Sequence, residues 1–366
     1  MGNWQDNHII DLFGIELPII QAPMAGATTP EMVIATSEAG GLGSLPAALL
    51  TTEQTKAALD QIRSATSKPI NVNFFAHANP ATDAVAQMTW RAVLAPYYVE
   101  LGLDPAAPVP AAGRAPFDND YCTLVESYRP EVVSFHFGLP GQDLLERVRH
   151  TGAKIIASAT TVAEARWLVE RGVDAVIAMG LEAGGHRGNF LSDDMITQVG
   201  TMALVPQIVD AVPVPVIAAG GISDRRGVRA AFALGASAVQ VGTAYLLTPE
   251  AKVTAFHREA LKSARDDNTA LTNIFTGRPA RGIVNRIMQE IGPLSQAAPA
   301  FPTAGGALAP LRAVTEKEDR SDFSNMWAGQ AASLAREMSS AELTRYLVEA
   351  AGVEAEKSET PATVRM

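Results

Sequence analysis

Cysteine is almost absent from the 366-residue sequence, in which Cys122 stands alone. A single cysteine excludes an intramolecular disulfide, a CxxC redox pair and a zinc site built from several thiolates. Metal-binding patterns are also missing, because the six histidines are widely scattered and none of them forms an HExxH pair. We therefore expect no bound metal, and the scarcity of thiols suits a reducing cytoplasm.

Positive charge and long apolar runs are scarce as well. Lysine and arginine number 29 against 39 acidic residues, which gives a net charge of -10 at pH 7. Nucleic acids and anionic membrane surfaces attract basic patches, so the acidic balance disfavours both as partners. No apolar stretch approaches the roughly 20 residues that cross a bilayer, and the start, MGNWQD, lacks the features of a secretion signal. We expect a soluble cytoplasmic protein that binds neither nucleic acid nor membrane.

Short apolar runs bounded by glycine or proline recur through the first two thirds of the chain, and they alternate with alanine-rich segments of helical spacing. The runs are too continuous for half-buried strands, and strands buried on both faces with helices between them form parallel βαβ units. Eight such units close into a (β/α)8 TIM barrel, the α/β fold that we predict. The runs are 18–24, 41–46, 69–75, 132–138, 154–160, 175–182, 215–222 and 238–246.

Helices and insertions complete the predicted organisation. Segments 30–38, 161–171 and 224–234 place apolar residues at helical spacing after a Pro, Thr or Asp start, which predicts outer helices of the barrel. Stretches 76–118 and 249–320 break the rhythm and indicate insertions that form a smaller appended lobe or lid. The predicted domains are a barrel over 1–248 with 76–118 inserted, a lid or substrate lobe over 249–320, C-terminal helices over 321–353 that pack back on the barrel, and a polar tail over 354–366.

A glycine-rich loop follows the sixth run and reads EAGGHRG over 182–188. Active sites of parallel barrels lie at the C-terminal ends of the strands, so this loop is a candidate site. Gly184 and Gly185 would let the backbone approach a flat ligand closely, and His186 would supply a titratable group near neutral pH. The alternative interpretation is a tight turn that carries a surface histidine.

Two further strand ends suggest a phosphate site. The seventh run ends in AAGGIS and leads into a helix, and the eighth contains QVGT. Loops after strands seven and eight, with free N–H groups and a helix N-terminus, bind phosphate in many barrels. Gly220, Gly221, Gly242 and Thr243 are therefore phosphate candidates, unless these small residues serve only the packing of two buried strands.

The first and third runs contribute the other side of the predicted site. The backbone of Pro23 and Met24 and the amide of Asn73 could hydrogen-bond the polar edge of a flavin ring. A methionine at this position also serves as core filler in many proteins. His136, in the fourth run, is equally compatible with a structural role and with a position in the mouth of the barrel.

Seven segments in order give the chain its family resemblance, and the combination of EAGGHRG, AAGGI and QVGT is specific. The chain resembles nitronate monooxygenases, formerly called 2-nitropropane dioxygenases, over most of its length. The matching segments are QAPMAG at 21–26, NVNFF at 71–75, VVSFHFG at 132–138, LEAGGHRG at 181–188, VIAAGGI at 216–222, VQVGTAYL at 239–246 and RPARGIVN at 278–285.

The resemblance implies a barrel that holds noncovalent FMN and oxidises an alkyl nitronate with O2 to a carbonyl compound and nitrite, through a flavin semiquinone. His186 matches the catalytic histidine of the family, either as a base toward a neutral nitroalkane or as a charged partner of the bound anion. The positive charge that an anion needs would come from His186 in its charged form or from Arg187. The implied cofactor-binding residues are Pro23, Met24, Asn73, Met179, Gly184, Gly185, Gly220, Gly221, Gln240, Val241, Gly242 and Thr243.

Two positions depart from the family pattern. Met179 stands where the family usually has glutamine, so a side-chain hydrogen bond to the cofactor is lost. Around 300–306 the expected tyrosine-rich segment of the substrate pocket is replaced by Phe301 and small residues. We therefore expect these positions to alter the cofactor's environment and the choice of substrate.

Two other functions remain open at the level of sequence. An FMN-dependent enoyl-thioester reductase has a similar barrel with a glycine-rich histidine loop at the sixth strand, although RPARGIVN and the long insertion favour the nitronate enzyme. A non-redox barrel that binds a phosphorylated metabolite would explain the phosphate site without a flavin. The sequence gives no indication of oligomeric state.

Overall fold

A parallel barrel dominates the computed structural model, which describes residues 6–110 and 114–349. Eight strands form one sheet in the order β1-β9-β8-β6-β5-β4-β3-β2, with every neighbouring pair parallel. Each strand lies within one of the eight apolar runs, so the predicted (β/α)8 barrel is confirmed. The strands are β1 Ile19–Gln21, β2 Gly43–Pro46, β3 Ile70–Phe75, β4 Val132–His136, β5 Lys154–Ala159, β6 Ala175–Met179, β8 Val216–Ala219 and β9 Ala238–Val241.

The barrel closes between β1 and the residue that precedes β2. Ile20 and Leu42 form a parallel bridge. The Gln21 N–H donates to the Leu42 carbonyl at 3.0 Å, and the Leu42 N–H donates to the Ile19 carbonyl at 2.9 Å. The sheet therefore has no free edge at this point, and all eight strands deliver their C-terminal ends to one rim.

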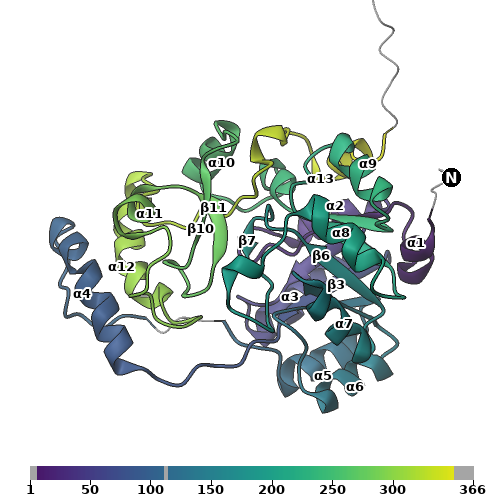
Figure 1. Ribbon diagram of the computed structural model, residues 1–366, viewed down its shortest axis with the longest axis horizontal. Coiled ribbons are helices and arrows are strands. Elements are labelled where there is room, and N and C mark those ends of the chain that lie inside the picture. The colour runs from purple at the N-terminus through teal and green to yellow at the C-terminus, as the bar shows by residue number, and fades with distance from the viewer. Residues whose placement is uncertain (1–5, 111–113, 350–366) are drawn as a thin grey trace, which may run out of the picture.

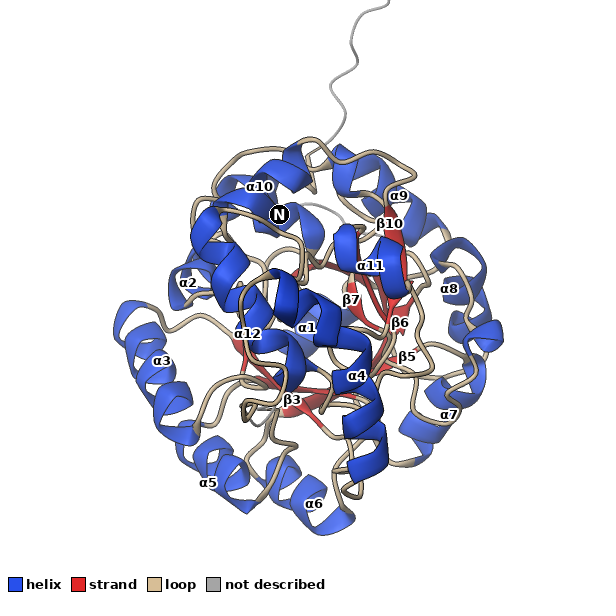
Figure 2. Cartoon of the chain, turned by 90° about the vertical axis from the view of Figure 1, so that its left-hand side faces the viewer, coloured by secondary structure: helices blue, strands red, loops and turns tan. Residues whose placement is uncertain are grey.

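Helices surround the barrel, as Figure 2 shows for α3 and for α5 to α9. The predicted segments 30–38, 161–171 and 224–234 match α2, α7 and α9, and Thr161 and Asp224 cap the last two as expected. The outer helices are α2 Pro30–Glu38, α3 Thr52–Ala65, α5 Asn119–Tyr128, α6 Gln142–His150, α7 Val162–Glu170, α8 Thr201–Val209, α9 Arg225–Ala233 and α13 Ser340–Tyr346.

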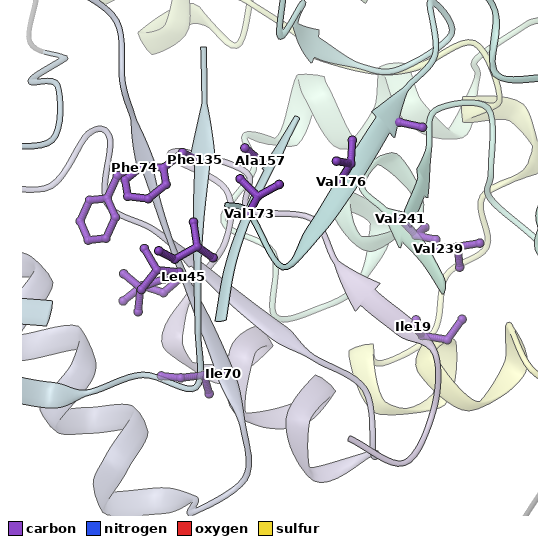
Figure 3. Close-up of a cluster of buried hydrophobic side chains, with 14 of the residues drawn as sticks. Ile19, Leu45, Ile70, Phe74, Phe135, Ala157, Val173, Val176, Val239 and Val241 are labelled. Carbon is purple, nitrogen blue, oxygen red and sulfur yellow. The ribbon is translucent and has the colours of Figure 1, made fainter. Parts of the chain in front are cut away.

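Alternation along each strand divides the core into two layers. Ile19, Val176 and Val241 face outward and pack with the helices in the largest hydrophobic cluster, part of which appears in Figure 3. Ile20 and Ile177 face inward and pack with the short helix α1 (His8–Phe13), which closes the end of the barrel opposite the strands' C-terminal ends.

A smaller lobe lies beside the barrel, on the left in Figure 1. Its core joins α4 (Ala84–Glu100), which comes from the 76–118 insertion, to α12 (Gly305–Thr315), which comes from the later one. Trp90 Nε1 donates to the Ala304 carbonyl at 3.0 Å, and the Tyr98 hydroxyl donates to the Ala307 carbonyl at 2.6 Å. The lobe also contains α10 Ala255–Lys262, β10 Thr269–Thr272, β11 Ala280–Ile283 and α11 Arg286–Ile291.

A three-stranded antiparallel sheet joins the lobe to the barrel. Its order is β10-β11-β7, and β7 is the dipeptide Gly185–His186 from the glycine-rich loop. His186 pairs with Ala280, and Gly185 pairs with Arg281. The candidate histidine is therefore fixed by a strand of the lobe as well as by the barrel strand that precedes it.

The segment before α13 differs from the predicted C-terminal helices. It contains only the short 3-10 turn Ala332–Leu334, and Trp327 forms a bridge with Gly282 of β11. The Gly329 N–H donates to Thr243 Oγ1 at 2.9 Å, and the Gln330 N–H donates to the Glu182 carbonyl at 3.0 Å. These backbone groups bond to loops at the barrel rim instead of to one another, so tertiary contacts override the helical periodicity. The predicted tail, 354–366, lies outside the described residues.

Candidate functional site

A cavity of about 560 Å³ lies between the C-terminal ends of the barrel strands and the lobe. This volume is within the range of small-molecule and cofactor sites. The cavity brings together most of the residues that the sequence singled out, although they come from the ends of five different barrel strands. They are Pro23, Met24, Asn73, Met179, Gly184, Gly185, His186, Gly220, Gly221, Gln240, Gly242 and Thr243.

Val241 is the exception among the predicted cofactor residues. Its side chain is fully buried in the outer hydrophobic layer, and it does not line the cavity. Its carbonyl accepts a hydrogen bond from the Ala22 N–H at 2.8 Å, which helps to join β9 to β1. Successive side chains of a strand point to opposite faces, so the exposure of Gln240 to the cavity requires Val241 to face away.

One end of the cavity has the features of an anion cradle. Gly220 and Gly221 have φ angles of 104° and 71°, which L-residues with side chains rarely adopt. Among the described residues, none accepts a hydrogen bond from the N–H groups of Gly221, Gly242 or Thr243. Unpaired N–H groups beside the start of α9 are suited to bind a phosphate.

A buried acceptor lies next to this cradle. Gln240 lines the cavity, and its Oε1 atom is buried without a hydrogen-bond partner among the described residues. Buried polar atoms are rarely left unpaired in folded proteins. A ligand that carries hydroxyl or N–H groups would satisfy this atom, so the donor set fits a polyol phosphate.

Gly184 has a steric role in the glycine-rich loop. A Cβ atom at this position would lie 2.6 Å from the Ala328 carbonyl carbon and from the Gly329 nitrogen. Only glycine therefore allows the loop to pack against this segment. Gly185 has a φ angle of 72° and turns the chain into β7.

His186 is held at the cavity by hydrogen bonds around its ring and its backbone. Its Nε2 atom lies 3.0 Å from Thr276 Oγ1, and the Thr276 hydroxyl donates to the Arg278 carbonyl at 3.3 Å. The hydroxyl has one proton, so it accepts from Nε2–H, and this leaves a lone pair on Nδ1. His136 Nε2 lies 3.3 Å from the His186 carbonyl, and His136 Nδ1 lies 3.1 Å from Ser158 Oγ. His136 thus lines the cavity and contacts the loop that carries His186.

Aromatic rings form the wall around His186. The ring centroid of His186 lies 5.4 Å from that of Phe301, 5.6 Å from Trp327, 6.0 Å from Phe137 and 6.2 Å from Phe75. These rings cover part of the imidazole, and His186 is half-buried. Burial, the Arg114 charge and other nearby cations hold the pKa of His186 well below its usual value of 6.5, so the ring is neutral at pH 7.

Arg114, which the sequence did not indicate, is one of three cationic side chains among the described residues that line the cavity, together with Lys252 and Arg312. Burial and the neighbouring charge of Arg312 lower its pKa to about 10, and the side chain remains protonated at neutral pH. No carboxylate in the described part of the chain pairs with this guanidinium. Arg114 lines the cavity, and its Cζ lies 5.8 Å from the centroid of the Phe301 ring, whose centroid in turn lies 5.4 Å from that of His186.

Arg187 does not supply the charge that the sequence assigned to it. Its side chain is fully buried and does not line the cavity. Its guanidinium donates to the carbonyls of Gly180 at 2.6 Å and Met179 at 2.9 Å, and to Gln198 Oε1 at 3.0 Å. Arg187 is therefore a brace for the glycine-rich loop. The sequence also offered a charged His186 as the source of positive charge. This expectation is wrong, because the pKa of His186 is lowered and the ring is neutral at pH 7.

Comparison with known families agrees with the geometry of the cavity. The family model described as nitronate monooxygenase matches residues 6–350. The chain belongs to the nitronate monooxygenase family.

Relatives of known name match the chain over nearly its full length. Nitronate monooxygenase from Pseudomonas aeruginosa is 41% identical over 348 residues, with 92% of this chain and 97% of the relative covered. Nitronate monooxygenase from Paraburkholderia phytofirmans is 38% identical, with 93% of each chain covered. The sequence similarity therefore extends over both the barrel and the lobe.

Solved structures also resemble this chain over nearly its full length. Nitroalkane oxidase from Streptomyces ansochromogenes is 36% identical with a TM-score of 0.84, over 93% of this chain and 96% of that chain. FabK from Thermotoga maritima is 27% identical with a TM-score of 0.69, over 94% and 95%. This nitronate monooxygenase family member is thus more similar in fold to the nitroalkane oxidase than to FabK.

The structure of this family member also bears on metals and membranes. Over residues 6–110 and 114–349, no three His, Cys, Asp or Glu side chains are grouped so that they could hold a metal ion. In the same ranges, no helix has the length and apolar character needed to cross a bilayer.

Because its buried histidines have lowered pKa values, we expect the free energy of unfolding of this nitronate monooxygenase family member to fall in mild acid. Burial lowers the pKa of His77 and His257 to about 4 and that of His136 to about 3, and the pKa of His186 is also lowered. The unfolded chain binds protons on these rings near pH 6.5, whereas the folded chain does not, so stability falls as pH drops below 6.5. We expect a loss of roughly 1 kcal/mol per histidine at pH 5.5, measured by urea unfolding.

A variant separates this effect from general acid unfolding. Replacement of His257, which lies outside the His186 cluster and contacts the Trp327 carbonyl at 3.2 Å, removes one of the four groups. His257→Gln should therefore show a shallower decline of unfolding free energy between pH 7 and 5. An identical pH dependence in the variant would contradict the depressed pKa of His257.

Proposed function

We propose that the protein is an FMN-dependent nitronate monooxygenase, which uses O2 to convert alkyl nitronates into carbonyl compounds and nitrite. Membership of the nitronate monooxygenase family supports the reaction. The observation that carries the proposal is the presence, in one cavity, of a neutral His186 among aromatic rings and of Arg114 without a carboxylate partner. This arrangement suits a small organic anion, because the cation binds it and no carboxylate competes for the cation.

The residues at the phosphate end fit FMN. The N–H groups of Gly221, Gly242 and Thr243 would hold its phosphate, and Gln240 Oε1 would accept from its ribityl hydroxyls. Met24 and Asn73, across the cavity, would lie near the ring. When bound, FMN supplies the redox centre that accepts electrons from the organic substrate and returns them to oxygen.

The side chains around the reacting group have separate tasks. Arg114 binds the negatively charged oxygens of the nitronate through charge-assisted hydrogen bonds. The Nδ1 lone pair of His186 accepts the α-proton when a neutral nitroalkane enters, and Thr276 keeps the ring in the required tautomer. Phe75, Phe137 and Phe301 exclude water from the reacting atoms, which strengthens the attraction between Arg114 and the anion.

Anaerobic mixing tests the function directly. Purified protein loaded with FMN is mixed with ethyl nitronate without oxygen, and the flavin absorbance is followed; oxygen is then admitted and nitrite is measured. We expect a loss of the oxidised flavin spectrum followed by nitrite formation. Rapid oxidation of NADH or NADPH with an enoyl thioester, and no reaction with nitronate, would instead support the reductase. A colourless protein that takes up no FMN would support a non-redox phosphate-binding barrel.

Gly242→Asp tests the phosphate site without a measurement of activity. A Cβ atom here meets Ala22 and Met24 only at 3.5 and 3.8 Å, and the φ angle of -111° suits any residue, so the fold should accept the change. The added carboxylate would face the phosphate, and we expect at least about tenfold weaker FMN binding in a titration of flavin fluorescence. Gly242→Ala is the matched control and should bind several times more tightly than Gly242→Asp. Equal affinities of the two variants would place the phosphate elsewhere.

A further inference from the structure

One face of α12 extends the cavity well beyond His186. Gly305, Ala309, Arg312 and Glu316 line it, and their spacing of four, three and four residues places them on one side of the helix and its continuation. At a rise of 1.5 Å per residue, this face is about 16 Å long. The cavity therefore has an elongated part, a channel that runs along this face of α12. Figure 2 shows α12 in front of the barrel strands.

The inner end of the channel adjoins the reacting groups. Phe275 and Trp327 also line it, with ring centroids 5.6 Å apart, and the Trp327 ring lies 5.6 Å from that of His186. Gly305 has no side chain and Ala309 has only a methyl group, so α12 leaves space for a ligand here. Gly306, which also lines the cavity, is held against the 76–118 segment: a Cβ atom on it would lie 2.5 Å from the Pro110 carbonyl oxygen.

The outer end of the channel is polar and reaches solvent. Arg312 and Glu316 form an ion pair at 3.3 Å, and Ser324 Oγ donates to Glu316 Oε1 at 2.6 Å. The side chains of Arg312 and Glu316 are 41% and 31% exposed. Because the pair is internally neutralised, this end offers no strong site for a charged group. An apolar or weakly polar chain fits the gradient from the aromatic inner end to the open outer end.

We propose that the α12 channel, formed by Gly305, Ala309, Phe275, Trp327 and the Arg312–Glu316 pair, holds an extended, unbranched substituent of the substrate. This inference rests on the proposed nitronate oxidation and names its substrate class: long-chain primary nitronates. The reacting carbon lies at His186, the chain passes Gly305 and Ala309, and its end reaches the ion pair. Ala309 has only a methyl group, so it leaves room for the chain to pass, and a larger side chain at this position would shorten the channel.

Chain-length profiles of the wild-type holoenzyme and two variants test the channel. Each methylene group that the channel removes from water contributes favourable transfer free energy, which raises kcat/KM by about three- to fourfold. We therefore expect kcat/KM to rise from ethyl to octyl nitronate in the wild type. Ala309→Leu fills the channel with a residue of high helix propensity. It should lower the octyl-to-ethyl ratio of kcat/KM at least tenfold relative to Ala309→Ser, which changes the volume little.

The failure of each claim has a distinct signature. A ratio that is equal in Ala309→Leu and Ala309→Ser, or a wild-type profile that does not rise with chain length, overturns the channel. Absence of turnover with ethyl and octyl nitronates alike overturns the proposed reaction. In that case, binding of 1-nitrooctane, followed by tryptophan fluorescence, still tests the channel: at least tenfold weaker binding to Ala309→Leu than to Ala309→Ser supports it, and equal binding overturns it.

Discussion

His186→Ala should lower kcat/KM for neutral nitroethane by about 10²- to 10⁴-fold, the range of a lost general base. The ring is neutral, and its Nδ1 lone pair is free because Nε2–H is engaged by Thr276. With preformed ethyl nitronate the α-proton is already absent, so the loss should be about tenfold or less. Initial rates of nitrite formation with the two substrates, at equal flavin content, measure the difference.

The same variant distinguishes the two roles that the sequence left open. A charged His186 that only attracts the anion would matter most for nitronate, so nitronate would then lose at least as much activity as neutral nitroethane. Equal losses, or no loss at all, would therefore contradict the base. The control is the FMN content of His186→Ala, which should equal that of the wild type, because the phosphate cradle at Gly221, Gly242 and Thr243 does not involve the imidazole.

Arg114→Met should raise the KM for ethyl nitronate by about 10- to 100-fold, since a hydrogen bond to a charged group contributes about 1.5–3 kcal/mol. Methionine preserves much of the side-chain volume but removes the positive charge of Arg114, which has no carboxylate partner in the described part of the chain. Steady-state kinetics over a range of nitronate concentrations, with neutral nitroethane for comparison, provide the measurement. The KM for neutral nitroethane should change less, because a molecule without net charge is attracted less strongly by the Arg114 cation.

Arg114→Lys is the matched control, because it keeps the positive charge and should recover part of the nitronate affinity. A second readout is the pH profile. The Arg114 charge contributes to the lowered pKa of His186, so its removal should raise that pKa. The acid limb of nitroethane oxidation should move to higher pH in Arg114→Met and stay nearer the wild-type position in Arg114→Lys. An unchanged KM and pH profile in Arg114→Met would remove Arg114 from the site.

The barrel could be predicted because its signals are local. Continuous apolar runs between glycines and prolines contained all eight strands, and Thr161 and Asp224 marked the starts of α7 and α9. Strand alternation also carried information that the prediction did not use: it places Gln240 at the cavity and Val241 in the outer layer. The long-range bonds of Gly329 and Gln330 have no local signal, and the predicted helix at that position was wrong.

The charge of the site escaped prediction for a similar reason. Arg114 lies in the 76–118 insertion, far in sequence from His186, and nothing around it in the sequence marks it as buried. Arg187 stands next to His186 in the chain, yet its side chain turns away to bind the carbonyls of Met179 and Gly180. Proximity in sequence therefore suggested an arginine that does not line the cavity, whereas Arg114 reaches the cavity through the packing of the lobe on the barrel.

The β7–β11 pairing has a consequence for the redesign of this scaffold. The cofactor end of the cavity belongs to the barrel, whereas Thr276, Phe301 and α12 belong to the lobe, so exchange of the lobe alone would appear to offer a route to new substrates. However, His186 is itself a strand residue of the lobe's sheet, paired with Ala280. A chimeric enzyme must therefore inherit β7 and β11 from the same parent, since a junction between them would separate His186 from the strand that aligns it.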